Sequence, residues 1–400
     1  MPIDPPLRIL HLNDHLAAVG GVETYLLGLL PRLEELGHEV HFGFAKGDPD
    51  VVRNAHRLPH LSSIRQADIG AAGQEVSRLI ERLRPDVVHV HGVGNLGAMR
   101  AAVASGRAVL HGHDFRPICP ASNFFFKRTR TICQRQSGAA CYAVSLLRHC
   151  MTPRPAPALS MLRRVSWIRA HAGHFRCVIA PSKSARQRFL QAGFSDRQLL
   201  TLPYFCPIPA REQPREMPSQ ATITYLGRAS YNKGWETFIS VTGLLGNAVR
   251  GLMVGNFSAA QKQEIQRLAQ RAGCRERLEV QGWAGRDAIG SLMARTSVLV
   301  FPSLWPETLG IVGLEALSQG VPVVASDVGG VGEWLLPGET GLLAQPGDAD
   351  SFATALARIL GDPTLGAAMG RAGIDLIREE FLPERHVHGL LDGYRASLAG

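Results

Sequence analysis

Two acidic residues, Glu307 and Glu315, stand in an otherwise apolar stretch of this 400-residue chain, WPETLGIVGLEALSQG at 305–320. The strand-like run SVLVFPS precedes them, and we expect a helix to begin near Gly310. On a single helix, eight positions would separate the two side chains by about 80° and about 12 Å along the axis. Such a pair does not share a proton or clamp one metal ion. We predict that the two carboxylates bind different parts of one extended ligand.

The start of this helix offers further polar contacts. The free backbone amides of Gly310 and Ile311 would favour phosphate or sugar oxygens. Glu315 stands among apolar residues and needs hydrogen-bond donors, which the vicinal hydroxyls of a ribose would supply. The alternative is structural: Glu307 would be a first-turn acid, and Glu315 a glutamate whose carboxylate is satisfied within the protein.

Two basic residues, Arg228 and Lys233, follow the strand-like run TITYLG. A position between a strand end and a helix suits cations that neutralise a diphosphate, and a departing nucleoside diphosphate gains negative charge as its bond breaks. Two basic residues in a loop are otherwise ordinary surface charges. We favour the phosphate-binding interpretation because of the strand that precedes them.

Glycines and histidines mark two further turns. Gly20 and Gly21 in GGVETY would let the backbone approach a ligand closely, although they do not form a full dinucleotide fingerprint. The run AVLHGHD ends with His111, His113 and Asp114. A histidine there could hydrogen-bond a sugar hydroxyl, support a leaving group, or only cap the end of the strand.

Four of the seven cysteines lie in a segment, 116–170, that is also rich in arginine and proline. They are separated by thirteen, seven and eight residues, without the closely spaced pairs typical of zinc sites. A thiolate zinc site, a redox-sensitive loop and ordinary thiols are the alternatives for this set: Cys119, Cys133, Cys141 and Cys150. In the same segment, FFFKRTR at 124–130 could touch an anionic membrane surface or acceptor, or pack its phenylalanines into its own domain.

Charge and composition narrow the class of partner. The net charge of +9 and the isoelectric point near 9.5 favour an anionic partner. Basic residues do not alternate with stacking aromatics, so a phosphorylated ligand or anionic lipid suits the pattern better than nucleic acid. The start MPIDPPLRIL does not resemble an export signal, and an odd cysteine count indicates reduced thiols. We therefore expect a cytoplasmic protein that could bind peripherally to the inner face of the cytoplasmic membrane.

Strand-like runs alternate with helix-like segments in two successive series, which predicts an α/β protein with two Rossmann-like, doubly wound parallel-sheet domains. We place an amino-terminal domain at 1–205, with the insert at 116–170, and a proline-rich linker at 206–220. The second domain is placed at 221–382, followed by a terminal helix at 383–400 that could cross back to the first domain. Because doubly wound sheets bind ligands at the carboxyl ends of their strands, we expect a site in a cleft where the domains face each other.

The stretch with the two glutamates resembles the Glu-x7-Glu signature of the retaining GT-B glycosyltransferases, the glycogen-synthase-like, nucleotide-sugar-dependent family of group 1 and family 4. Three other segments are similar to that family: GGVETYLLGLLPRLEELGHEVHFG, YLGRASYNKGWETFI and GVPVVASDVGGVGEWLLPGETGLLAQPGD. The similarity covers most of both halves and is densest from 222 to 348. It does not cover the insert at 116–170.

The resemblance implies a GT-B fold and a glycosyltransferase. The enzyme would move a hexosyl or similar group from a nucleoside-diphosphate sugar to a hydroxyl of a glycan, a lipid-linked acceptor or a small molecule. It implies retention of anomeric configuration through a front-face mechanism with an oxocarbenium-like transition state. The resemblance also implies that the enzyme needs no cofactor. It implies no divalent metal either, because the positive charges of Arg228 and Lys233 would replace that of a metal ion.

The resemblance also assigns roles to residues of this chain. His113, Arg228, Lys233 and Glu307 would be catalytic, with Glu307 at the hydroxyls of the transferred sugar. Glu315 would bind the ribose, and the backbone at Gly282–Trp283 the base. Leu309 stands where many relatives have phenylalanine. The full donor-binding set implied in this way is Gly20, Gly21, Gly227, Arg228, Lys233, Gly282, Trp283, Glu307, Thr308, Leu309, Gly310, Ile311 and Glu315.

Other functions suit a two-domain fold of this kind. A nucleotide-sugar epimerase or hydrolase would require a carboxylate or histidine that abstracts a sugar proton. A non-catalytic nucleotide-sugar-binding subunit would keep the fold but lose site residues, whereas Arg228, Lys233, Glu307 and Glu315 are all present. A dinucleotide oxidoreductase lacks its Gly-x-Gly-x-x-Gly turn here.

Overall fold

The computed structural model describes residues 5–17, 20–213 and 215–399, and its contacts divide the chain into two compact units. Unit 1 comprises Met1–Thr129, Cys133–Tyr204 and Pro383–Gly400, and unit 2 comprises Arg130–Ile132 and Phe205–Leu382. Position 214 of the predicted linker and position 400 of the predicted terminal helix lie outside the described residues.

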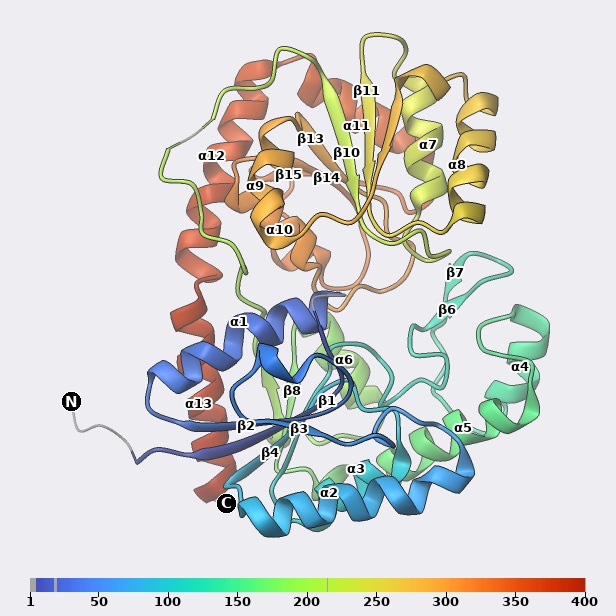
Figure 1. The fold of residues 1–400 in the computed structure, drawn as a ribbon. Helices are drawn as coiled ribbons and strands as arrows, with labels where there is room; N and C mark the ends of the chain where they lie inside the picture. Colours follow the sequence, from blue (N-terminus) through green and yellow to red (C-terminus); the bar gives the residue numbers. More distant parts are fainter. Residues whose placement is uncertain (1–4, 18–19, 214, 400) are drawn as a thin grey trace. The chain divides into compact units, whose positions relative to one another are not determined.

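Unit 1 is built on a parallel sheet of seven strands in the order β3-β2-β1-β4-β5-β8-β9 (Figure 1). The strands are β1 (Arg8–Leu16), β2 (Glu39–Gly47), β3 (Ala55–Arg57), β4 (Val87–Val90), β5 (Ala108–His111), β8 (Cys177–Ala180) and β9 (Leu199–Thr201). The helices are α1 (Gly21–Glu35), α2 (Ile69–Leu83), α3 (Leu96–Ala104), α5 (Pro155–Ala170), α6 (Lys183–Gln191) and α13 (Pro383–Ala399). Every side chain of β4, β5 and β8 is buried, as expected for central parallel strands covered on both faces.

The segment between β5 and α5 contains little regular structure, and its residues Arg130–Ile132 belong to unit 2. It contains the two-stranded ladder β6 (Phe125–Phe126) and β7 (Thr131–Ile132), and the short helix α4 (Cys141–Arg148). Phe124 and Phe125 are buried and Phe126 is partly buried, which favours packing over membrane contact for the first two rings.

Unit 2 repeats the design with a parallel sheet of six strands in the order β12-β11-β10-β13-β14-β15. Its strands are β10 (Thr222–Leu226), β11 (Arg250–Val254), β12 (Leu278–Gln281), β13 (Val298–Phe301), β14 (Val323–Ser326) and β15 (Gly341–Ala344). Its helices are α7 (Trp235–Leu244), α8 (Ala259–Arg271), α9 (Arg286–Ala294), α10 (Ile311–Ser318), α11 (Ala349–Leu360) and α12 (Pro363–Glu380). Residues 205–213 contain no regular element and belong to this unit.

Short 3-10 helices connect several of these elements. They are η1 (Pro49–Val51), η2 (Gln66–Asp68), η3 (Ala172–His174), η4 (Asp196–Gln198), η5 (Arg275–Arg277) and η6 (Val331–Glu333). The prediction of two doubly wound parallel sheets is confirmed. The edge strand β3 was not predicted, because its sequence AHR carries no apolar alternation.

The strand order locates where each sheet should bind a ligand. All strands are parallel, but successive strands are added to opposite sides of the β1–β4 pair in unit 1 and of the β10–β13 pair in unit 2. At such a switch point the connecting loops diverge to opposite faces and leave a crevice at the carboxyl ends of the strands. Residues that directly follow β1, β4, β10 and β13 are therefore the first candidates for function.

The terminal helix α13 packs within unit 1. The Tyr25 hydroxyl of α1 is 2.8 Å from Nε2 of His386, and the Tyr394 hydroxyl is 2.5 Å from Nδ1 of His89 in β4. All four side chains are buried. Buried hydrogen bonds therefore join the carboxyl-terminal helix to α1 and to the central strand β4 of the first sheet.

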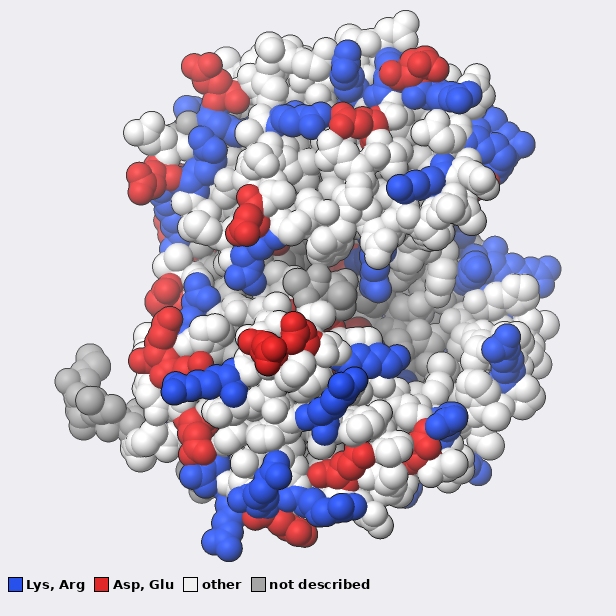
Figure 2. Space-filling view, viewed as in Figure 1, with Lys and Arg blue, Asp and Glu red and all other residues white. Residues whose placement is uncertain are grey.

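The described helices include none that is long and apolar enough to cross a membrane. Figure 2 shows lysine and arginine interspersed with aspartate and glutamate over the face it displays. Binding to an anionic membrane surface stays a prediction.

A glycine in α10 provides a test of the packing beside the unit 2 site. A Cβ added to Gly313 would lie 2.1 Å from the ring of the fully buried Trp334. We expect Gly313→Ala to lower the free energy of unfolding by about 1–3 kcal/mol through overpacking, although alanine is normally favoured in a helix. Urea denaturation would measure the change. Gly332→Ala is the control, because a Cβ there meets nothing within 4 Å; equal effects of the two changes would contradict the argument.

Candidate active site

In unit 2, the loops that follow β10 and β13 meet at the switch point. The amide of Leu304 donates to the carbonyl of Asn232 at 2.8 Å. Gly234 has φ of 68°, and a Cβ there would lie 1.7 Å from the carbonyl oxygen of Pro302. The left-handed backbone and the close approach both require glycine at this position. These contacts fix the loop that carries Lys233 against the loop that carries Glu307.

Lys233 and Glu307 form an ion pair at this point. The Lys233 ammonium is 2.6 Å from Oε1 of Glu307, which also accepts a hydrogen bond from the Ser303 hydroxyl at 2.5 Å. The carboxylate is nearly buried, with 5% of its side chain exposed, whereas 23% of the lysine is exposed. The ammonium also lies 5.2 Å from the centroid of the Trp305 ring. A buried carboxylate thus holds a partly exposed cation in place.

Arg228 lies at the carboxyl end of β10 with an exposed side chain. Its carbonyl accepts a hydrogen bond from the Tyr225 hydroxyl at 2.6 Å. Burial and the Glu307 carboxylate raise the pKa of Tyr225, and the Arg228 guanidinium opposes this shift. Arg228, Lys233 and Glu307 are therefore close together at one end of the second sheet.

Glu315 is buried in α10, about one turn after the loop that carries Glu307. Burial raises the pKa of this carboxyl to about 7, and the Arg286 guanidinium opposes the shift. A ligand that donates hydrogen bonds to Glu315 would favour its charged form. The sequence expectation that the two acids occupy a loop and a helix, rather than one helix, agrees with these positions.

The remaining predicted donor-binding residues of unit 2 lie either around the start of α10 or directly after β10 and β12. Gly310 has φ of 111° and precedes α10, whose first residue is Ile311. Leu309 is fully buried, and its carbonyl accepts a hydrogen bond from the Trp334 indole at 2.7 Å, so it fixes the loop. Thr308 is buried as well. Gly227 directly follows β10. Gly282 and Trp283 follow β12, and Trp283 is 46% exposed.

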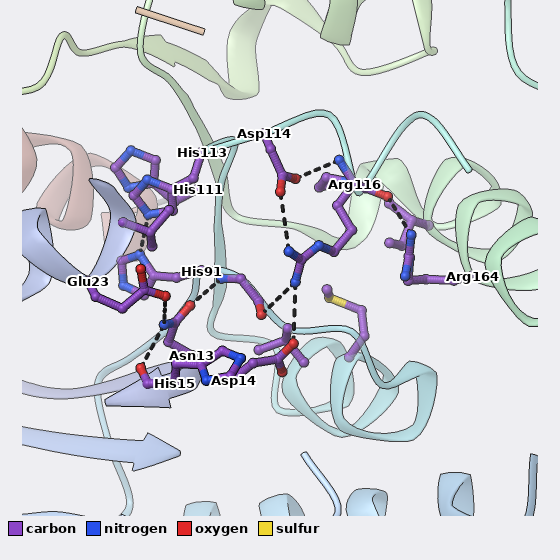
Figure 3. A pocket seen from close by; sticks show the side chains of 16 residues that line it. Asn13, Asp14, His15, Glu23, His91, His111, His113, Asp114, Arg116 and Arg164 are labelled. Carbon is purple, nitrogen blue, oxygen red and sulfur yellow. Dashed lines mark hydrogen bonds and ion pairs between the residues drawn. The ribbon is translucent and has the colours of Figure 1, made fainter. Parts of the chain in front are cut away.

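In unit 1, a cavity of about 90 Å³ lies at the β1–β4 switch point (Figure 3). Its most prominent charged group is Arg116, whose guanidinium stands between two carboxylates, 3.3 Å from Asp14 and 3.3 Å from Asp114. Burial raises the pKa of Asp14 to about 6, and Arg116 opposes the shift. A second guanidinium, that of Arg164, is buried beside it, and burial lowers its pKa to about 10. Among the described residues, its Nε atom has no hydrogen-bond partner.

The start of α1 borders this cavity. Gly20 precedes the helix in an extended conformation, and a Cβ there would lie 2.9 Å from a carboxylate oxygen of Glu23. The Asn13 side chain donates to the other oxygen of Glu23 at 3.4 Å and accepts from the amide of Gly92 at 2.8 Å. Gly21 is the first residue of α1. The predicted glycine turn therefore lies beside a polar cavity.

His113 lines the same cavity as part of a buried chain of hydrogen bonds. Its Nδ1 atom is 2.8 Å from the Tyr204 hydroxyl, and its Nε2 atom is 2.7 Å from Nδ1 of His91. His91 in turn is 2.9 Å from His11. Burial lowers the pKa of His113 and His91 well below 6.5, so both rings are neutral. A hydrogen bond from His113 to a sugar would require one of these partners to be exchanged.

The buried histidines also form two groups whose ring nitrogens lie within 4.8 Å of one another: His11, His89 and His91, and His91, His111 and His113. These are the described side chains nearest to a metal-binding geometry. A role was predicted only for the histidines at the end of AVLHGHD, although DVVHVHG also holds histidines at alternate positions and RILHLN holds one more on a neighbouring strand. That alternation is the signal that would have revealed the cluster.

Two successive Rossmann-like parallel-sheet units, each with polar residues at its switch point, are the architecture of the GT-B fold. The family model described as glycosyl transferases group 1 matches residues 209–375, and the model described as glycosyltransferase family 4 matches residues 19–204. The chain belongs to the group 1 glycosyltransferases. Proteins of this family are enzymes of carbohydrate biosynthesis.

Known proteins similar over nearly the full length support this assignment. The chain is 27% identical to a 2-deoxystreptamine glucosyltransferase of Streptomyces kanamyceticus, covering 94% of each chain. It is 26% identical to a 2-deoxystreptamine N-acetyl-D-glucosaminyltransferase of Streptomyces fradiae, covering 96% of this chain and 94% of the other. The fold matches Anabaena Alr3699/HepE, solved in complex with UDP and glucose, with a TM-score of 0.70, 16% identity and coverage of 96% and 98%.

Proposed function

We propose that this enzyme transfers a sugar from a nucleoside-diphosphate sugar to a hydroxyl of a small, hydroxyl-rich acceptor, with retention of anomeric configuration. The observation that carries the proposal is the Lys233–Glu307 ion pair at the switch point of unit 2. A partly exposed cation held by a buried carboxylate, beside a second cation and a helix start, suits a diphosphate that leaves with negative charge.

The ion pair suggests how the donor is used. A diphosphate oxygen would take over part of the Lys233 ammonium, and Arg228 would share the charge that develops on the leaving group. The Glu307 oxygen released in this way becomes an acceptor for a hydroxyl of the transferred sugar. Glu315 would accept from the ribose hydroxyls. A phosphate oxygen on the same face would then take the proton of the acceptor hydroxyl, which accounts for retention without an enzyme nucleophile.

Two features support a small, polar acceptor. The unit 1 cavity presents Asp14, Glu23 and Asp114, which can accept hydrogen bonds from hydroxyl or amino groups. Both full-length relatives reported above are named for 2-deoxystreptamine, a hydroxylated ring that carries amines. We propose an acceptor of this chemical class, with Asp14 and Glu23 as its carboxylate contacts.

The test is a matrix of nucleoside-diphosphate sugars against cyclitol and aminocyclitol acceptors. We expect release of nucleoside diphosphate from one donor only when an acceptor is present, and a product whose anomeric configuration by NMR equals that of the donor. Full activity after chelation with EDTA is expected, because cationic side chains replace a metal. Inversion of the anomeric centre would contradict the mechanism.

The same matrix separates the alternatives. Donor hydrolysis or epimerisation without acceptor dependence would favour a nucleotide-sugar hydrolase or epimerase. Donor binding by calorimetry without turnover under any acceptor would favour a binding subunit. Sedimentation with anionic vesicles at low and high salt tests the predicted peripheral membrane contact, which should weaken as salt rises.

A further inference from the structure

The four cysteines of the insert lie around one cavity, although their spacing in the sequence is irregular. All four cysteines line a partly open cavity of about 30 Å³, whose other walls include Phe124, Phe125 and Met151. They come from three parts of the segment: Cys119 from the turn after β5, Cys133 from the end of β7, and Cys141 and Cys150 from the two ends of the α4 region. None of the four is in a disulfide.

This segment has almost no hydrophobic core of its own. Between Phe125 and Ala158, a range that the structure describes throughout, no apolar side chain is fully buried. Leu146 and Leu147 are 48% and 66% exposed. Disulfides and structural metal ions are the usual way in which small, loop-rich regions with little buried apolar surface gain stability.

The backbone of the segment is held in unfavourable conformations. Of the five non-glycine residues with positive φ in the described chain, four lie here: Ser122, Phe124, Arg130 and His149. Such conformations persist only when the surroundings enforce them. Backbone hydrogen bonds from Arg128 to Arg148 and from Cys133 to Phe124 hold part of this segment, and a metal ion shared by the cysteines would add a further cross-link.

Backbone amides surround the sulfurs. The backbone amides of Phe124, Asn123 and Ala121 face the sulfur of Cys119. The amides of Arg135 and Met151 face the sulfurs of Cys133 and Cys150 respectively. The amide of Gly138 donates to the sulfur of Cys141 at 3.4 Å. A neutral thiol accepts hydrogen bonds weakly, whereas a metal-bound thiolate is stabilised by such donors.

The charge of the segment suits an anionic centre. Residues 119–150 contain five lysines and arginines and no aspartate or glutamate. Arg135 lines the cavity, and Arg188 of α6 donates to the carbonyl of Cys133 at 3.2 Å and lies 4.9 Å from the Phe124 ring centroid. Four thiolates around a divalent cation carry a net charge of about −2, which these side chains would balance.

We propose that Cys119, Cys133, Cys141 and Cys150 bind one structural Zn²⁺ ion as tetrahedral thiolate ligands, and that this ion holds the insert in its conformation. On binding, each thiol releases its proton to solvent, which leaves a doubly negative four-thiolate complex. Zn–S distances of about 2.3 Å place the sulfurs about 3.8 Å apart. Among the described residues, only histidines form groups of three ligand atoms that lie within 4.8 Å of one another. The four sulfurs are therefore farther apart than in a zinc site, and their loops must move closer together as zinc binds.

Zinc content of the intact protein, purified under reducing conditions without chelator, tests this proposal. We expect about one zinc per chain by mass spectrometry of the metal, and thiolate-to-metal charge-transfer absorption after cobalt replaces zinc. Cys133→Ser and Cys150→Ser should each lose the metal. Cys274→Ser, which changes a buried cysteine of unit 2 outside this cluster, should keep it.

The following outcomes would overturn the proposal. The reduced wild-type protein would have a zinc content near zero even after zinc is added. The four cysteines would form disulfides as their stable state, or Cys133→Ser would have the same metal content as the wild type. Iron bound by the four thiolates instead of zinc would also contradict it. Trypsin digestion gives a readout on the wild-type protein alone: cleavage at the exposed Lys127 and Arg128 should speed up after zinc removal. None of these measurements uses sugar transfer, so the zinc proposal can fail or succeed independently of the proposed function.

Discussion

Replacing Lys233 with methionine is expected to lower the rate of sugar transfer by about 100- to 1,000-fold, the typical effect of removing one group that stabilises developing negative charge. Methionine keeps much of the length of the side chain but removes the cation that lies 2.6 Å from Glu307. Steady-state kinetics with saturating donor would measure the loss as a fall in kcat. Lys262→Met is the control, because it removes an exposed lysine of α8 on the same unit and should leave kcat unchanged.

The same substitution should also reduce stability, because it leaves a nearly buried carboxylate without its cation. We expect a loss of about 2 kcal/mol in the free energy of unfolding, moderated by the partial exposure of the lysine. Adding Glu307→Gln to Lys233→Met should restore most of that stability, since the neutral amide still accepts from Ser303. Transfer activity should stay low in the double variant. Recovery of activity together with stability would mean that the ion pair is only structural.

Stability is expected to fall steeply as the pH drops below about 6, because burial strongly lowers the pKa of six of the histidines in unit 1. Burial lowers the pKa of His11 to about 3 and that of His386 to about 4, and it lowers the pKa of the others well below 6.5. The others are His89, His91, His111 and His113. In the unfolded chain each would take up a proton near pH 6.5. Their contribution to stability is present above pH 6.5 and is lost as the pH falls toward the folded-state pKa values.

Two buried carboxyls act in the opposite direction. The pKa of Asp14 is raised to about 6 and that of Glu315 to about 7, so both bind a proton in the folded state before the unfolded chain does. Six histidines against two carboxyls leave the unfolded state with about four more protons near pH 5, which corresponds to about 5 kcal/mol per pH unit.

Urea denaturation at pH 7.5, 6 and 5 would measure this slope. His89→Asn should reduce it by about one proton, whereas His149→Asn, at an exposed position of the insert, should leave it unchanged. Equal unfolding free energies at pH 7.5 and pH 5 in the wild type would contradict the assignment of neutral, buried rings.

The sequence by itself determined the architecture of both halves and the loops that carry the candidate site. Runs such as VLVF and VVAS are apolar on both faces, which only a covered parallel strand requires, and Gly310 marks the start of α10. Spacing alone placed Glu307 in a loop and Glu315 in a helix. These features are local, because periodicity and turn residues act over a few positions.

Only the tertiary structure brought together groups that are distant in the chain. Lys233 and Glu307 are 74 positions apart, and they meet because β10 and β13 are neighbours at the switch point. The histidine chain likewise depends on β1, β4 and β5 lying side by side, and the four cysteines share a cavity because their loops fold over Phe124 and Phe125. Strand order and loop closure are decided by packing over the whole unit, and for that reason residue spacing could not reveal these partners.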